Sequence, residues 1–143
     1  MTLVENPRKE FVLVVDSDCL RGRALLTRLR ALGYYAASFV RGEDALKFAA
    51  ENEPDAIVSD WSLSDMQGVE FARRAKTQSF ATKLILLSGQ ADWRILRATL
   101  ECGGEDLLTH PVSMEHLLST LGRLTDVEQA SKPNLSADSP ASA

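Results

Sequence analysis

The sequence predicts an α/β protein with a doubly wound, five-stranded parallel sheet and five helices. Five short apolar runs alternate with segments whose apolar residues recur at a helical period, which is the pattern of repeated βα units. A chain of 143 residues is long enough for one such domain. The predicted strands are Phe11–Val15, Tyr34–Phe39, Ala56–Ser59, Lys83–Leu87 and Asp106–Thr109.

Each gap between predicted strands, and the segment after the last one, has the spacing of an amphipathic helix. Glycine or proline follows the first, second and fourth of these helices and stops them, because neither residue continues a helix readily. Right-handed crossovers between parallel strands then place helices on both faces of the sheet. The stripes that define the helices are Leu25-Leu29-Leu32, Ala45-Leu46-Ala49, Val69-Ala72-Ala75, the segment from Asp92 to Cys102, and Met114-Leu117-Leu118-Leu121-Leu124.

The two ends of the chain differ from its middle in composition. Residues 1–10 are charged and poor in apolar side chains, residues 11–126 form the predicted domain, and residues 127–143 turn to Ser, Ala, Pro and Asp and are predicted to be a disordered tail. No apolar run approaches the ~20 residues of a membrane span, and no secretory signal is recognisable. We therefore expect a cytoplasmic protein that does not contact a membrane, with Cys19 and Cys102 reduced.

The net charge of −4 gives no electrostatic footprint for nucleic acid. Four arginines crowd one stretch, and we interpret them as a solvated helix face. These four arginines are Arg21, Arg23, Arg28 and Arg30.

No further domain is recognisable after the fold. The expected output is therefore contact with a downstream protein and not direct DNA binding, and formation of a homodimer stays open.

Polar side chains follow three of the predicted strands at the point where each strand ends. Asp16 follows the first strand, Asp60 follows the third, and Ser88 follows the fourth. Because the carboxyl ends of parallel strands meet at one edge of a sheet, these side chains are expected to share a site. Gly68 comes eight residues after Asp60 and would let the intervening loop turn tightly.

These features resemble the receiver domains of two-component response regulators, which have a flavodoxin-like fold. The resemblance spans roughly Phe11 to Leu124. Any one of its motifs is weak alone, whereas four in the right order at the ends of predicted strands are specific. The motifs are Val14-Val15-Asp16-Ser17-Asp18, Asp60-Trp61-Ser62-Leu63-Ser64-Asp65-Met66-Gln67-Gly68, Leu87-Ser88-Gly89 and Gly103-Gly104-Glu105-Asp106-Leu107-Leu108-Thr109-His110-Pro111.

The resemblance implies that Asp60 accepts a phosphoryl group from a histidine kinase or a phosphotransfer protein, with no conventional enzymatic turnover. It also implies that Mg²⁺ is held by Asp16, by Asp60 and by the backbone carbonyl of Ser62. Ser88 would donate a hydrogen bond to the phosphoryl group. These parts suit the chemistry, because the approach of an anion to a phosphoryl group needs positive charge and hydrogen-bond donors around it.

Four positions depart from the family pattern, one of them Ser64, which stands where proline is common. Ser17 stands where the family has a second acidic residue that binds Mg²⁺ directly, and a neutral hydroxyl is a poorer ligand, so we expect weakened metal binding. We interpret Asp18 as a helix cap and not as a replacement ligand. His110 stands where the family has a lysine, and Leu107 where it usually has an aromatic switch residue.

Two alternatives follow from these departures and from the first motif. One is a degenerate receiver that binds partners without being phosphorylated, which Ser17, Leu107 and His110 favour. The other is a phosphohydrolase of the haloacid dehalogenase type, because Asp16-x-Asp18 resembles the nucleophile and the acid/base of that family. The residues after Asp18 do not match that family, which also needs a larger domain.

Overall fold

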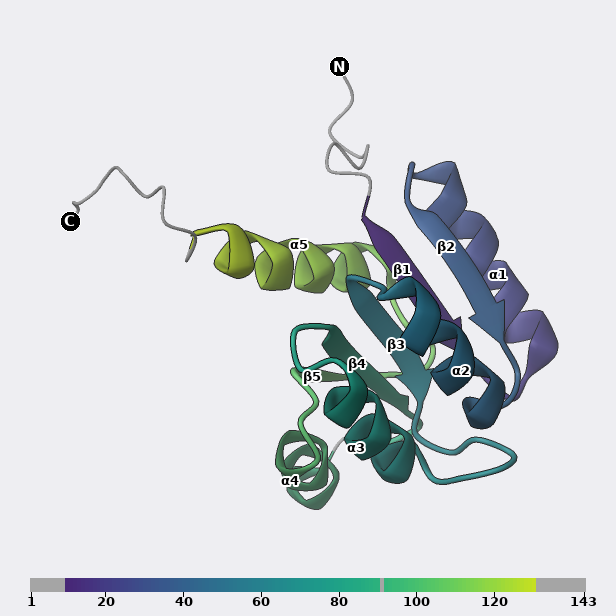
Figure 1. Cartoon of the computed structure of the whole chain (residues 1–143), viewed down its shortest axis with the longest axis vertical. Coiled ribbons are helices and arrows are strands. Elements are labelled where there is room, and N and C mark those ends of the chain that lie inside the picture. Colours follow the sequence, from purple (N-terminus) through teal and green to yellow (C-terminus); the bar gives the residue numbers. More distant parts are fainter. Residues whose placement is uncertain (1–9, 91, 131–143) are drawn as a thin grey trace. The chain divides into compact units, whose positions relative to one another are not determined.

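The computed structural model describes residues 10–90 and 92–130 and confirms the predicted fold class. Five parallel strands form one sheet in the order β2-β1-β3-β4-β5 (Figure 1). Every predicted strand forms, with each boundary where it was predicted or one residue away. The strands are β1 (Phe11–Val15), β2 (Tyr35–Phe39), β3 (Ala56–Asp60), β4 (Lys83–Ser88) and β5 (Asp106–Thr109), and the helices are α1 (Cys19–Ala31), α2 (Gly42–Asn52), α3 (Gly68–Gln78), α4 (Trp93–Glu101) and α5 (Met114–Ala130).

The chain forms two compact units, one up to Pro111 that contains the sheet and α1 to α4, and one from Val112 that contains α5. At the start of α5, the hydroxyl of Ser113 accepts the backbone N–H of His116. The helix continues to Ala130, so residues 127–130 are helical, whereas their composition predicted a disordered tail. The rest of that tail and residues 1–9 lie outside the described residues.

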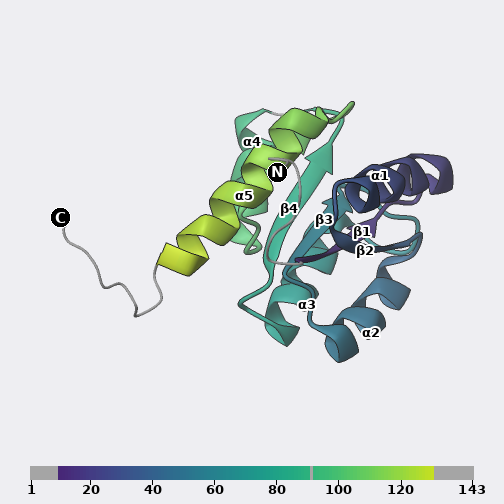
Figure 2. The ribbon, with the colours of Figure 1, turned by 90° about the horizontal axis from the view of Figure 1, so that it is seen from above.

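Helices cover both faces of the sheet, with α2 and α3 on one face and α1 on the other (Figures 1 and 2). Because successive side chains of a strand point to opposite faces, strands buried on both sides read as continuous apolar runs. The strands contribute Leu13, Val15, Ile57, Leu84 and Leu86 to the core under α2 and α3, and the two helices contribute Ala45, Leu46, Ala49, Phe71, Ala72 and Ala75.

A buried ion pair joins the end of α3 to the start of β5. The ammonium of Lys76 lies 2.8 Å from Glu105 Oε2 and also donates to the backbone carbonyls of Phe80 and Thr82. The other oxygen of Glu105 accepts the backbone N–H of Leu84, at the start of β4. This cluster lies at the amino ends of the strands, away from the edge where Asp60 lies, and it ties three elements together.

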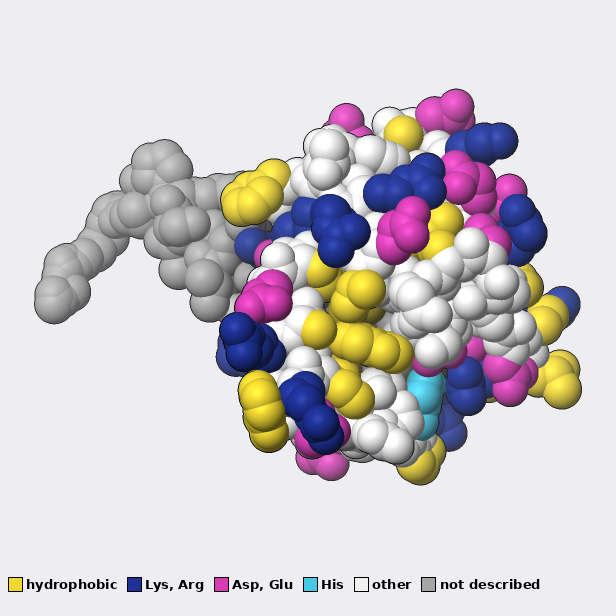
Figure 3. Space-filling view, turned by 90° about the horizontal axis from the view of Figure 1, so that it is seen from below, with side chains coloured by type: hydrophobic (Ala, Val, Ile, Leu, Met, Phe, Trp, Pro, Cys, Tyr) yellow, Lys and Arg dark blue, Asp and Glu magenta, His cyan; other side chains and the backbone are white. Residues whose placement is uncertain are grey.

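Charged side chains of both signs are interspersed over the face shown in Figure 3, and hydrophobic side chains gather near its middle. No large patch of one sign is visible on this face, in keeping with the small net charge of −4. In the part of the chain that the structure describes, no helix has the length and apolar character that a membrane span requires.

Candidate functional site

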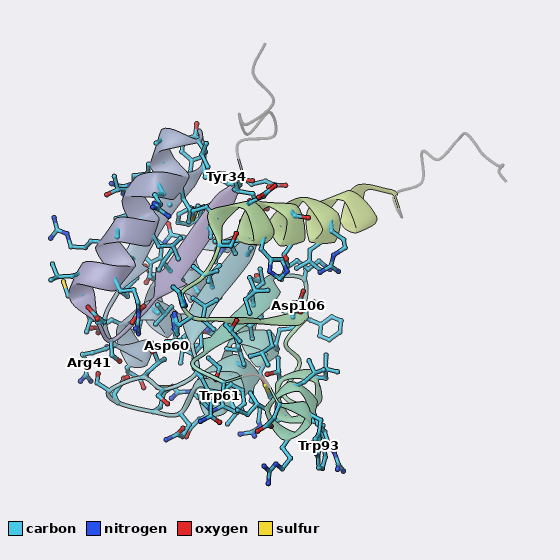
Figure 4. The ribbon with its side chains drawn as sticks, turned by 180° about the vertical axis from the view of Figure 1, so that it is seen from behind. Tyr34, Arg41, Asp60, Trp61, Trp93 and Asp106 are labelled. Atoms are coloured by element: carbon cyan, nitrogen blue, oxygen red, sulfur yellow. The ribbon has the colours of Figure 1, made fainter. Side chains whose placement is uncertain are left out.

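The carboxyl ends of β1, β3 and β4 bring the predicted acidic and hydroxyl side chains to one edge of the sheet. Val15 pairs with Ser59 on β3, and Asp60 pairs with Leu87 on β4, so Asp16, Asp60 and Ser88 follow neighbouring strand positions. Figure 4 shows Asp60 at this edge, beside the loops. All three side chains belong to residues that are less than 9% exposed. The three strand ends thus lie at one edge of the sheet, while their joint role as a site stays a prediction.

Both oxygens of Asp60 are engaged. Oδ1 accepts the backbone N–H of Trp61 at 3.1 Å and lies 2.9 Å from Nε2 of His110. Because an ionised carboxylate only accepts hydrogen bonds, Nε2 is the donor in that contact. His110 is positioned by its backbone, since its N–H donates to the carbonyl of Ser88 at 2.9 Å. His110 therefore contacts the candidate phosphoacceptor directly.

The second oxygen of Asp60 contacts Arg21, a residue that sequence reasoning placed on a solvated helix face. Arg21 Nη2 lies 3.2 Å from Asp60 Oδ2, and the same guanidinium holds Asp16 through Nε at 2.8 Å and Nη2 at 3.0 Å. The hydrogen bond to Asp16 raises the pKa of Arg21 above its ordinary value, so this side chain is a cation throughout the accessible pH range. All four arginines are exposed, as predicted for a solvated face, but the prediction missed that the guanidinium of Arg21 binds Asp16 and Asp60.

One sequence signal could have identified Arg21. It lies in the first turn of α1, which contains no acidic residue. A cation is unfavourable there because the helix dipole places positive charge at the amino end. Arg21 tolerates this position because two carboxylates of the site offset that charge.

Asp18 caps α1 as predicted, because its carboxylate accepts the backbone N–H of Arg21 at 3.1 Å. Its own N–H donates to Asp16 Oδ1 at 2.9 Å. Between these residues, the hydroxyl of Ser17 is buried and has no hydrogen-bond partner among the described residues. Asp18 therefore fixes the start of the helix, and Asp16 receives donors from both the backbone and Arg21.

The hydroxyl of Ser88 accepts the backbone N–H of Gln90 at 3.1 Å, which leaves its own hydrogen free to donate. Leu107, at the position of the family's switch residue, is half-buried and packs against the core under α2 and α3. The packing of Leu107 does not by itself indicate a role in signalling.

Ser62 is exposed and lies in the loop after β3. A bridge between Ser62 and Gln67 closes this loop.

The loop after β3 is tied to α2 through Asp65. One oxygen of Asp65 accepts the backbone N–H of Gly42 at 2.8 Å and the other accepts that of Glu43 at 2.9 Å. Burial raises the pKa of the Asp65 carboxyl, but these two N–H groups and the charge of Arg41 outweigh burial, and its pKa is lowered from its ordinary value. Asp65 thus acts as the helix cap of α2 from a distant part of the chain.

Replacing Asp65 by alanine is expected to lower the free energy of unfolding by about 1 kcal/mol at neutral pH, the usual effect of losing a helix cap. Because the folded pKa of Asp65 is lowered, this contribution is present above the ordinary value of 3.8 and is lost as pH falls through the folded pKa. Urea unfolding at several pH values measures it, with the exposed loop residue Ser64→Ala as control. A difference between wild type and Asp65→Ala that did not shrink in acid would contradict this account.

The residues at this edge do not fit the magnesium site that the resemblance implies. Mg²⁺ prefers charged oxygens in octahedral geometry, and here both carboxylates already bind Arg21 while Ser17 offers only a neutral hydroxyl. Among residues 10–90 and 92–130, no cluster of three or more His, Cys, Asp or Glu side chains could hold a metal ion. Magnesium binding by Asp16, Asp60, Ser62 and Ser17 stays a prediction, which this arrangement does not favour.

Comparisons with known proteins agree with this fold. Two curated relatives are the transcriptional regulatory protein KdpE of Mycobacterium tuberculosis, 31% identical over 90% of this chain, and PrrA of Mycobacterium bovis, 33% identical over 86%. The chain spans 58% of the first protein and 52% of the second.

Two solved structures are also similar. The BeF3-activated receiver domain of DrrB is 30% identical with a TM-score of 0.74, and the match covers 82% of this chain and 97% of that receiver domain. The receiver domain of the Francisella response regulator 1452 is 26% identical with a TM-score of 0.77, covering 83% and 98%. Residues 12–122 match the response regulator receiver domain family, so the chain with its buried Asp60 at the end of β3 belongs to the receiver domains of two-component response regulators.

Proposed function

We propose that Asp60 accepts a phosphoryl group from a histidine kinase or a phosphotransfer protein, and that the chain signals through contact with another protein. The observation that carries the proposal is the pair of donors on Asp60, a permanent cation on Oδ2 and an imidazole N–H on Oδ1. Positive charge and fixed donors around the attacked phosphoryl group are what this transfer requires.

The transfer breaks a P–N bond on the donor and forms a P–O bond on Asp60. A carboxylate oxygen of Asp60 attacks phosphorus, and the electron pair of the P–N bond goes to the donor imidazole, which takes up a proton. Arg21 and His110 are placed to stabilise the charge on the transferred group, and the hydroxyl of Ser88 has a hydrogen to donate to one of its oxygens. The step is stoichiometric, so no turnover of a substrate is expected.

Intact mass after incubation with a small phosphodonor tests this proposal, with Asp60→Asn as the matched variant. Wild type is expected to gain the mass of one phosphoryl group, and Asp60→Asn is expected to gain none because an amide is not a nucleophile under these conditions. A phosphoryl mass that persists in Asp60→Asn, or its absence from wild type with both a small donor and a phosphorylated phosphotransfer protein, would overturn the proposal.

A receiver that binds partners without phosphorylation is the second candidate. The observation that favours it is that Ser17, whose buried hydroxyl has no hydrogen-bond partner among the described residues, stands where related receivers have an acidic metal ligand. This candidate predicts equal partner binding by wild type and Asp60→Asn, whereas the first predicts that a phosphodonor changes partner binding only in wild type.

A further inference from the structure

The guanidinium of Arg21 joins the two buried carboxylates of the site. It forms a fork on Asp16, with Nε on one oxygen and Nη2 on the other, and Nη2 also reaches Asp60. The side chains of Asp16 and Asp60 are only 5% and 12% exposed, whereas that of Arg21 is 45% exposed. Arg21 therefore covers the acidic site from the solvent side, between the carboxylates and any ion that approaches them.

Local structure holds Arg21 in this position. Its backbone N–H donates to the cap residue Asp18, which fixes the first turn of α1 beside the end of β1. The next residue is Gly22, where an added Cβ would lie 3.3 Å from the Cβ of Asp16, so the helix passes very close to this acid. A side chain starting from that turn reaches both acids, and its planar fork suits a carboxylate better than a lysine would.

The site of this chain holds fewer acids than the family pattern. The family pattern implies a cation of charge +2 and a lysine opposite three acids, whereas this chain has Ser17 for one of those acids and His110 for the lysine. Two carboxylates remain here, the guanidinium of Arg21 contacts both, and His110 Nε2 lies 2.9 Å from Asp60. Addition of Mg²⁺ would leave uncompensated positive charge in a partly buried site, which is unfavourable.

We propose that Arg21 supplies the positive charge that a divalent cation supplies in related receivers, and that its guanidinium keeps Mg²⁺ from binding to Asp16 and Asp60. To bind both carboxylates, magnesium would have to displace the guanidinium from Asp16 and from Asp60, and it would find the neutral hydroxyl of Ser17 where the family has a third acid. The proposal deepens the proposed function, since a phosphoacceptor needs this charge, but its binding part stands whether or not Asp60 is phosphorylated.

Titration with Mg²⁺ tests the binding part directly. Trp61 follows Asp60 and reports on the site, and a Trp93→Phe background removes the other tryptophan, which is 66% exposed on α4. The double variant Arg21→Ala/Ser17→Asp is expected to bind Mg²⁺ at least about tenfold more tightly than wild type, which corresponds to about 1.4 kcal/mol. Arg23→Ala is the matched control, because Arg23 is exposed on the same helix, and it is expected to behave like wild type.

Two single variants separate the contributions. Ser17→Asp is expected to bind Mg²⁺ less tightly than the double variant because Arg21 still covers the site. Arg21→Lys keeps the positive charge but cannot form the two-pronged contact of a guanidinium with Asp16. If Arg21→Ala does not fold, Arg21→Lys/Ser17→Asp is compared with Ser17→Asp instead. Magnesium affinity in wild type equal to that of the double variant, or equal affinities for Ser17→Asp and the double variant, would overturn the proposal.

Phosphorylation provides the second readout. Wild type is expected to gain the phosphoryl mass at the same rate in EDTA and in Mg²⁺, whereas Arg21→Ala/Ser17→Asp is expected to need Mg²⁺. A wild-type rate that collapses in EDTA would overturn the proposal. Absence of phosphorylation in wild type and in the double variant under both conditions would overturn the proposed function alone, and the titration would still decide whether Arg21 excludes the metal.

Discussion

Replacing Glu105 by alanine is expected to lower the free energy of unfolding by about 3 kcal/mol, because removal of one partner of a buried ion pair leaves the other charge uncompensated. The remaining partner is the ammonium of Lys76, whose side chain is 8% exposed and would keep the carbonyls of Phe80 and Thr82 and the ring of Phe80, 5.1 Å away, but no negative charge. The same substitution removes the acceptor of the Leu84 N–H at the start of β4. The loss therefore combines an unpaired charge with an unsatisfied backbone donor.

Urea unfolding followed by circular dichroism measures this loss. Glu101→Ala is the matched control, because Glu101 pairs with Arg97 on the surface of α4 with both side chains more than 60% exposed, and such pairs contribute about 0.5 kcal/mol. The double variant Lys76→Met/Glu105→Ala is expected to recover much of the loss, since no unpaired charge is left. An effect of Glu105→Ala no larger than that of Glu101→Ala would show that the pair is not effectively buried.

The strands were predictable because burial on both faces makes each of them a continuous apolar run. β1 and β4 are almost entirely apolar until the site begins, so both the run and the polar residue that ends it are visible in the sequence. Parallel strands share the direction of their ends, and this geometry placed Asp16, Asp60 and Ser88 at one edge before any coordinates were known. The apolar pattern, however, gives only the edge and not the contacts made there.

The contacts that decide the chemistry depend on geometry between distant residues. Arg21 and Asp60 are separated by 39 positions, and Asp65 caps a helix 23 residues before it. The periodicity of the sequence does not indicate which distant residues form such pairs. The four arginines on α1 are equally consistent with a solvated helix face and with a contact to the acidic site. Only the position of Arg21 in a first turn, where a cation is disfavoured, distinguishes it from Arg23.

Two of the departures from the family pattern, Ser17 and His110, change the charges around Asp60. Ser17 alone suggests a weakened metal site, but the presence of Arg21 on Asp16 and Asp60 converts that loss into an exchange of one cation for another. His110 continues to donate to Asp60 from the position of the family's lysine. A chain can therefore lose a metal ligand and still have a permanent cation beside Asp60.

Gly68 links the fold to this site, because the start of α3 passes directly over the end of β3. A Cβ on Gly68 would lie 2.5 Å from the carbonyl oxygen of Trp61 and 2.7 Å from that of Asp60, and both are backbone atoms. The N–H of Gly68 also donates to the Trp61 carbonyl at 2.6 Å. Lack of space, and not a left-handed backbone, is therefore the reason for glycine here, which refines the prediction of a tight turn.

Gly68→Ala is accordingly expected to lower the free energy of unfolding by about 3 kcal/mol, at the upper end for overpacking, since the neighbouring atoms belong to the backbone and cannot rotate away. Relief of the clash must move Asp60 or Trp61, so the emission of Trp61 should change in the folded protein as well. Gly89→Ala is the matched control, because no atom lies within 4 Å of its Cβ position, and its effect should stay within about 0.5 kcal/mol. If both variants unfold at the same urea concentration, α3 can shift away from the end of β3 at no cost in stability. The close approach of Gly68 to Asp60 would then not constrain the site.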